Sequence, residues 1–264
     1  MNNRVLRCCI PTAVVFALAA PVFAADAKPQ PSSQLIVVTT VKVKPGMAKE
    51  WEAIQSDISN AYQKSGIPFR NVWQTTMFGD MYSYATASPI SKFADLDGDG
   101  PLLKAVGKEE SAKIIARLAA VTDSAHRMVI RSRPDISIGE MKTLPTTPVE
   151  LVRIHIAPGR TADYENLLKA EFLPAAKKGG TEVAIVYQTV LGGVGPEYHA
   201  VIVLNKLADF DEPSPIVKAL GKEGAAKLGA KFAGISVSSE TSIMRGRPDL
   251  SYTLKTDKAA AAGE

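Results

Sequence analysis

Cysteine is nearly absent from this 264-residue chain. The only two, Cys8 and Cys9, lie ahead of an apolar run at the N-terminus. A lipid-accepting cysteine would follow such a run, so a lipoprotein is not expected. If the leader is removed, the remaining chain can form no disulfide and no thiolate metal site.

Long apolar runs are also scarce. Arg4 and Arg7 precede an apolar stretch over residues 10–20, and small or apolar residues follow at 22–24. This order is typical of a signal peptide, and the stretch is shorter than the roughly 20 residues of a membrane span. We predict a signal peptide over 1–24 and a periplasmic or secreted protein with no membrane association after cleavage. The alternative is an uncleaved anchor.

No charge of one sign dominates the chain. Without Arg4 and Arg7 the count is 29 basic against 27 acidic residues, a net charge of +2. The basic residues are scattered among acidic ones. A nucleic-acid partner is therefore not expected, since it would need a clustered basic face.

What the sequence does contain is an internal repeat. Residues 43–46 (Val-Lys-Pro-Gly) match 156–159 (Ile-Ala-Pro-Gly), an offset of 113. After one inserted residue the offset becomes 114. At that offset 72–75 match 186–189, Tyr84 matches Tyr198, 104–109 match 218–223, and 131–137 match 245–251. Two copies are too few for a solenoid, so the pattern indicates a duplicated domain.

These matches set the predicted domain boundaries. The first repeat spans 35–138 and the second spans 149–254. A linker over 139–148 joins them, and 25–34 and 255–264 have the composition of disordered tails.

Each copy shows the same order of elements. An alternating strand pattern (35–43; 151–156) is followed by a Pro-Gly turn and a helical pattern, which Pro174 should kink or end in the second copy. Two strands come next (71–78 and 82–87; 184–191 and 198–204), then a helical region (101–121; 215–235) and a last strand. The order β-α-β-β-α-β is the ferredoxin-like pattern.

This order, present twice, resembles the dimeric α+β barrel superfamily, in which two such sheets close against one another. The resemblance implies an α+β fold with both halves in one chain, an intramolecular pseudo-dimer. Some members oxidise aromatic substrates or bind haem, so it also implies that the barrel interior could serve such a function.

Strand alternation suggests which side chains face the interior. Val152, Ile154 and Ile156 should meet the helices, so Arg153 and His155 should point inward, as should their counterparts Thr40 and Lys42. We also place Tyr84 and Tyr198 inward, with Ala85 and Ala87 on the helix side. The candidate ligand-binding residues are His155, Arg153, Tyr198, Tyr84, Trp73, Tyr187, Arg131 and Arg245. The alternative is an interior simply packed by these side chains.

Metal-binding signals are weak. His199 should point away from His155, and no histidine pair has metal-ligand spacing. Asp95, Asp97 and Asp99 copy the first half of a calcium loop, but its twelfth position is Val106 instead of Glu. Capping and turn formation is the alternative role for these aspartates. No cofactor is predicted, with haem and calcium as alternatives.

The signature Arg-x-Arg-Pro-Asp ends both copies, at 131–135 and 245–249. We interpret it as structural, with Asp135 and Asp249 each paired to an arginine. The alternative is that its arginines bind an anion.

Three functions remain open. The first is non-enzymatic binding of a small ligand or a partner protein by an exported monomer or homodimer. The second is a cofactor-independent oxygenase or a haem-handling enzyme, with His155 as base or axial ligand. The third is a structural oligomerisation module.

Overall fold

The computed structural model describes residues 33–254, which belong to one compact unit. The predicted signal peptide, most of the segment 25–34 and the tail 255–264 lie outside them. Gln34 is not disordered as predicted, because it exchanges hydrogen bonds with Ser132. None of the helices within 33–254 is long and apolar enough to span a membrane.

The two repeats have the predicted order of elements. The first contains β1 (Leu35–Val43), α1 (Ala48–Lys64), β2 (Phe69–Thr75), β3 (Ser83–Ile90), α2 (Pro101–Val121) and β4 (Thr122–Ser132). The second contains β5 (Val149–Ile156), α3 (Thr161–Leu167), α4 (Leu173–Lys178), β6 (Ala184–Leu191), β7 (Glu197–Val203), α5 (Pro215–Lys231) and β8 (Ser236–Gly246), followed by β9 (Tyr252–Thr253).

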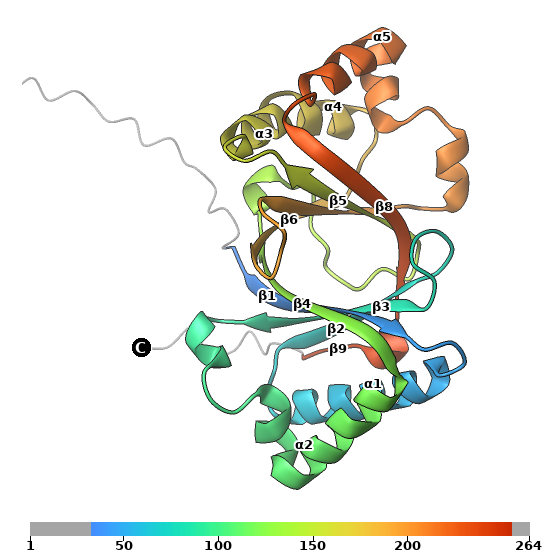
Figure 1. Cartoon of the computed structure of the whole chain (residues 1–264). Helices are drawn as coiled ribbons and strands as arrows, with labels where there is room; N and C mark the ends of the chain where they lie inside the picture. Colours follow the sequence, from blue (N-terminus) through green and yellow to red (C-terminus); the bar gives the residue numbers. More distant parts are fainter. Residues whose placement is uncertain (1–32, 255–264) are drawn as a thin grey trace, which may run out of the picture. The chain divides into compact units, whose positions relative to one another are not determined.

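Eight strands close into a barrel. Their order is β3-β1-β4-β6-β7-β5-β8-β2, and β2 pairs back with β3. Both junctions between repeats, β4 with β6 and β2 with β8, are antiparallel. The helices α1 and α2 cover one side of the barrel and α3, α4 and α5 cover the other (Figure 1). The fold is thus an α+β pseudo-dimeric barrel within one chain.

The residue inserted in the second repeat lies in its first helical region. There, a π-helical turn at Leu168–Phe172 separates α3 from α4. Such a turn accommodates one extra residue in a helix. Pro174 follows directly at the start of α4, and the helical path continues to Lys178. The predicted disturbance near Pro174 is therefore a π turn and not the end of the helix.

The predicted second helical regions are each interrupted. Gly107 in α2 and Gly221 in α5 have φ angles of 79° and 70°, in the left-handed region that favours glycine. Both glycines come from the matched segments 104–109 and 218–223. The interruption is therefore a feature of the duplicated unit, and the helical pattern alone did not reveal it.

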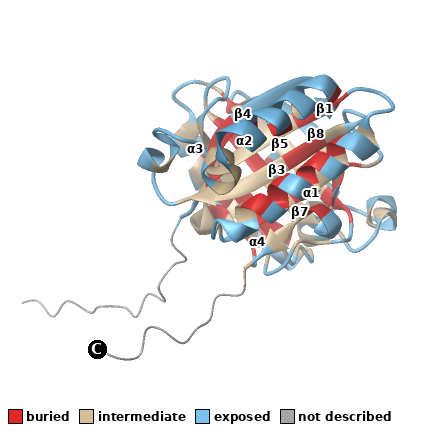
Figure 2. Ribbon diagram, turned by 90° about the horizontal axis from the view of Figure 1, so that it is seen from below, coloured by how far each residue is buried: buried red, intermediate tan, exposed pale blue. Residues whose placement is uncertain are grey.

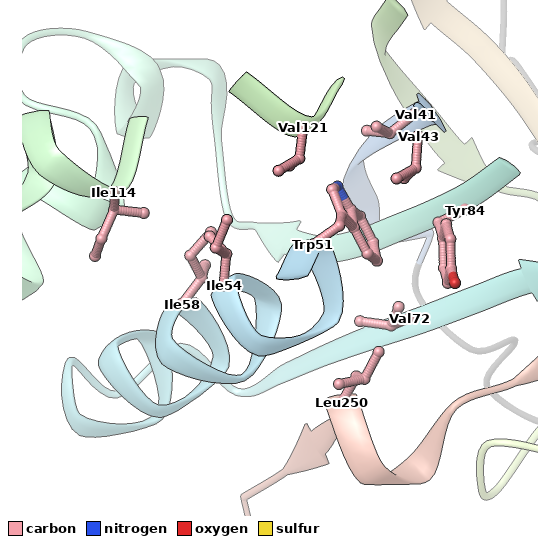
Figure 3. Packing of buried hydrophobic residues seen from close by; sticks show 10 residues of the cluster. All are labelled: Val41, Val43, Trp51, Ile54, Ile58, Val72, Tyr84, Ile114, Val121 and Leu250. Atoms are coloured by element: carbon pink, nitrogen blue, oxygen red, sulfur yellow. The ribbon is translucent and has the colours of Figure 1, made fainter. Parts of the chain in front are cut away.

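Each sheet packs its outer face against its own helices. In the first repeat Trp51 and Ile54 of α1 are fully buried against Val72 and Tyr84 (Figure 3). In the second, Tyr164 packs on Tyr198 with ring centroids 4.9 Å apart. In Figure 2 buried residues lie on the strands and on alternate turns of α1, whose remaining residues are exposed.

Each repeat also sends its C-terminal segment into the other repeat. Leu250 follows β8 but is buried in the core of the first repeat, beside Val72 (Figure 3). Ile136 follows β4 and is fully buried in the core of the second. The exchange therefore stabilises both repeats together.

The Arg-x-Arg-Pro-Asp signature fixes this exchange. Arg247 binds Asp249, and it also donates to Glu52 Oε1 (2.5 Å) and Gln74 Oε1 (3.0 Å) of the first repeat. Arg133 does the same with Asp135 and with Glu165 and Gln188 of the second repeat. We call these sets, with Tyr84 and Tyr198 respectively, the Arg247 cluster and the Arg133 cluster. The predicted arginine–aspartate pairing is confirmed.

Candidate functional site

The inward direction predicted for Arg153 and His155 is confirmed. Ile154 and Ile156 of β5 pack in the helix-side core of the second repeat. Because side chains alternate along a strand, Arg153 and His155 face the barrel interior. Thr40 and Lys42 on β1 also line interior space.

Tyr84 and Tyr198 were assigned to the wrong face. Both are almost completely buried on the helix side, where their hydroxyls donate to Glu52 (2.7 Å) and Glu165 (2.5 Å). Ala85, predicted on the helix side, lines the interior instead, as does Ala87. The tyrosine rings fill the wide space under the helices, and the small alanines leave the interior open.

This correction places Glu197 and His199 of β7 inside the barrel, next to His155. His199 Nε2 lies 3.0 Å from Glu197 Oε1 and 2.9 Å from Thr189 Oγ1. His155 Nε2 lies 3.7 Å from Glu197 Oε2. The expectation that His155 and His199 do not share a site is therefore wrong, since one buried carboxylate contacts both.

Glu197 is an ionised carboxylate in a buried position. Its burial opposes ionisation, but the hydrogen bond from His199 and the nearby charge of Arg153 outweigh that effect and hold the pKa of Glu197 below its usual range. Arg153 Nε lies 3.3 Å from Glu197 Oε1, and its Nη1 donates to Glu240 Oε2. We call Arg153, His155, Glu197 and His199 the polar wall.

An apolar cavity of about 310 Å³ adjoins the polar wall at Arg153 and His199, whereas His155 and Glu197 do not line it. We call it the inner cavity. Trp73 and Tyr187 line it, as predicted, together with Val149 and Met128; Arg153 and His199 supply polar atoms. The linker residues 141–144 also line it. The linker therefore contributes to the wall of the inner cavity.

A second, more polar cavity of about 620 Å³ lies toward the β2–β3 hairpin. We call it the outer cavity. Its lining includes Lys42, Asp80, Ser124, His126 and Glu240. Thr40, Ala85, Leu151, Arg153 and Met244 line both cavities, so the two adjoin at the level of Arg153.

Several predicted site residues lie elsewhere. Arg131 and Arg245 are exposed and line neither cavity. Asp95 Oδ2 accepts from the backbone N–H groups of Ser91 and Lys92. Asp209 does the same in the second repeat, which identifies a capping role. Within 33–254 no group of three or more His, Asp or Glu side chains is arranged to hold a metal ion, and this includes Asp95, Asp97 and Asp99.

The sequence did contain a signal for Glu197 and His199. In β7 the polar residues Glu197 and His199 alternate with Tyr198, Ala200 and Ile202. The apolar face of such a strand meets the helices, so the polar face is the interior. The argument that the small Ala85 and Ala87 fit best under the helices instead turns Tyr198 inward, which reverses the two faces of β7.

Comparisons with known proteins identify the fold only. No protein-family model and no curated protein sequence matches the chain. Among solved structures, an anthrone oxidase-like protein has a TM-score of 0.58 at 12% identity, with 87% of this chain and 96% of that chain covered. A candidate monooxygenase from Fusobacterium nucleatum subsp. nucleatum has a TM-score of 0.52 at 7% identity, covering 81% and 93%.

A candidate monooxygenase from Lactobacillus acidophilus NCFM is similar at a TM-score of 0.50 and 8% identity, covering 81% of this chain and 94% of that chain. Identities this low carry no information about substrate. The structural similarities agree with the strand order and the closed sheet described above. The chain thus has the dimeric α+β barrel fold, with both halves in one polypeptide.

Proposed function

We propose that this protein is a cofactor-independent oxygenase that acts on a small aromatic compound inside the barrel. The observation that carries the proposal is His199, which lines the apolar inner cavity and whose Nε2 lies 3.0 Å from the buried carboxylate of Glu197. A carboxylate that orients a histidine is a general-base arrangement. Two of the structurally similar proteins are candidate monooxygenases and one is anthrone oxidase-like.

The polar wall offers a base and an oxyanion partner. Since His199 Nε2 faces the Glu197 carboxylate and the Thr189 hydroxyl, that nitrogen carries the proton in the neutral ring and Nδ1 is the basic one. His199 would take a proton from an acidic C–H of the substrate. Arg153 would stabilise the oxyanion of the resulting enolate.

Oxygen is the oxidant in this proposal. The substrate carbanion adds O₂ to form a C–O bond, and the histidinium returns its proton to the peroxide. Cleavage of the O–O bond then leaves one oxygen as a carbonyl and releases the other as water, with the second hydrogen of the substrate carbon. The apolar lining of the inner cavity keeps bulk water from the carbanion.

The residues present favour the cofactor-independent reaction over haem. An axial ligand needs an accessible imidazole nitrogen, Nε2 of His199 and Nε2 of His155 both face Glu197, and Nδ1 of His199 is the atom assigned to the base. The inner cavity, at about 310 Å³, is also at the small end of the range for small-molecule sites. No step is therefore assigned to haem.

The test is oxygen uptake by the mature protein with anthrone, a tricyclic ketone with an acidic CH₂ group. The proposal predicts protein-dependent oxygen uptake with one O₂ consumed per anthraquinone formed. Glu197→Gln should lower kcat by roughly 100-fold, the scale of general-base catalysis.

Glu150→Gln is the matched control. Glu150 is on the adjacent strand β5 and faces the helix side, so this variant should keep its activity. Binding of anthrone without oxygen uptake would refute the oxygenase and favour a non-enzymatic binding protein. The leader sequence predicts that this activity, if present, is located in the periplasm or outside the cell.

A further inference from the structure

We infer that the ligand of this barrel is amphipathic, with an apolar ring system in the inner cavity and an acidic group that reaches Arg153. The inference rests on the proposed function, because it names the substrate class of the same site. It is carried by the position of Arg153 between two cavities of opposite character.

The two cavities differ in the side chains that they present. The inner cavity has Trp73, Tyr187, Val149 and Met128 in its wall. The outer cavity presents Lys42, Asp80, Ser124, His126 and Glu240. A ligand that occupies both must be apolar at one end and polar at the other, because an unmatched buried polar group is costly.

The space for such a ligand exists because the first repeat has a less bulky wall. The positions equivalent to Arg153 and His199 are Thr40 and Ala85, and both line the two cavities or their junction. The junction therefore has long polar side chains on one side and short ones on the other. An acidic group lying at the junction faces Arg153, the only charged residue among the five that line both cavities.

Arg153 can exchange an acidic partner at the end of its guanidinium group. Its Nε atom is buried 3.3 Å from Glu197 Oε1, while its Nη1 atom donates to Glu240 Oε2 at 3.3 Å. Its other carboxylate partner, Glu240, has a side chain that is 73% exposed. An exposed partner stabilises an ion pair little. A ligand carboxylate, sulfonate or ionised enol can therefore replace Glu240 with little loss.

Two fluorescent probes with one skeleton test this inference. 1-Anilinonaphthalene-8-sulfonate carries an acidic group, and N-phenyl-1-naphthylamine lacks it. Both should bind the mature protein at one site per chain. Arg153→Met should raise the Kd of the sulfonate at least tenfold and change that of the neutral probe less than twofold.

Arg127→Met controls for the loss of one positive charge, since Arg127 is exposed and lines neither cavity. It should change neither Kd. Glu240→Gln tests the opposite direction, because removal of the competing carboxylate should tighten sulfonate binding severalfold. A gain of affinity cannot come from a variant that folds poorly.

Equal effects of Arg153→Met on both probes, or no gain from Glu240→Gln, would overturn the acidic-group inference. These outcomes are independent of the oxygenase proposal. Charge-selective binding without oxygen uptake would leave the ligand class standing and refute the reaction. Oxygen uptake with no charge-selective binding would support the reaction and refute the ligand class.

Discussion

The two repeats are alike where they join and different where they face the interior. The Arg133 cluster and the Arg247 cluster match residue for residue, including the tyrosine that binds each glutamate. The inner walls do not match. Arg153, His155, Glu197 and His199 of the second repeat stand where the first has Thr40, Lys42, Ser83 and Ala85.

This contrast separates two kinds of requirement. Each cluster holds the exchanged C-terminal segment of one repeat against the other, so both copies are needed to close the barrel. A single ligand in the shared interior needs only one set of binding groups. The second repeat supplies that set, and the first supplies space.

The largest expected effect comes from removing the arginine of either cluster. Arg247→Met leaves Glu52 and Asp249 without their cation, and Arg133→Met leaves Glu165 without its arginine while Asp135 keeps Lys169 Nζ at 2.8 Å. Each variant should lower the free energy of unfolding by roughly 2–4 kcal/mol. Arg117→Met, which removes two exposed ion pairs, should leave the free energy of unfolding nearly unchanged. Urea unfolding measures all three. A large difference between Arg133→Met and Arg247→Met would show that the clusters are not equivalent.

The second-largest effect is expected from acid, which should weaken both clusters. Arginine partners hold the pKa values of Glu52, Glu165, Asp135 and Asp249 below their usual range. For carboxyls with depressed pKa, the stabilisation is complete above the unfolded-state pKa of about 4 and is lost as pH falls toward the folded value. Stability should drop by roughly 1–3 kcal/mol between pH 5 and pH 3.

The double variant Asp135→Asn and Asp249→Asn is the control for the acid effect. It removes two of the titrating groups, so its stability should depend less steeply on pH over the same interval. An unchanged slope would place the acid sensitivity outside the clusters.

Removing the tyrosine hydroxyls should have a smaller effect. Tyr84→Phe and Tyr198→Phe both keep the buried ring. Tyr198→Phe deletes one hydrogen bond, to Glu165, and Tyr84→Phe deletes two, one to Glu52 and one from Gln74 Nε2, at a cost of about 1 kcal/mol for each bond. Neither should alter ligand binding, because both rings lie on the helix side. A loss of binding in either variant would return that tyrosine to the interior, as first predicted.

The smallest effect is expected at the two turns that were considered for calcium. Asp95→Asn and Asp209→Asn each weaken the acceptor of two backbone N–H groups, and each should lower Tm only slightly. Thermal unfolding with and without calcium checks this. A calcium-dependent rise in Tm in the wild-type protein would contradict the capping role.

Much of the fold could be predicted because it depends on patterns that the duplication shows twice. The order of elements, the strands at 35–43 and 184–191, and the helix over 101–121 agree with the structure. The interruptions at Gly107 and Gly221 could not be predicted, since a helical pattern does not show where a glycine adopts positive φ. The exchange of Ile136 and Leu250 depends on contacts between repeats, which no local pattern contains.

The site was predicted only in part. The alternation in β5 placed Arg153 and His155 correctly, because Ile154 and Ile156 mark the helix side. In β7 an argument from side-chain size took precedence over the alternation of polar and apolar residues. It put Tyr198 on the interior face, and therefore Glu197 and His199 on the helix side. Their meeting with His155 depends on the β5–β7 pairing.

Contact quenching of tryptophan tests most directly whether the ligand binds inside the barrel. Trp73 lines the inner cavity and Trp51 lies in the helix-side core, and the chain has no other tryptophan. Titration with 4-iodobenzoate, an aromatic acid that quenches on contact, should quench the Trp51→Phe protein saturably and leave the Trp73→Phe protein unchanged. Equal quenching of both proteins, or none of either, would contradict a binding site in the interior.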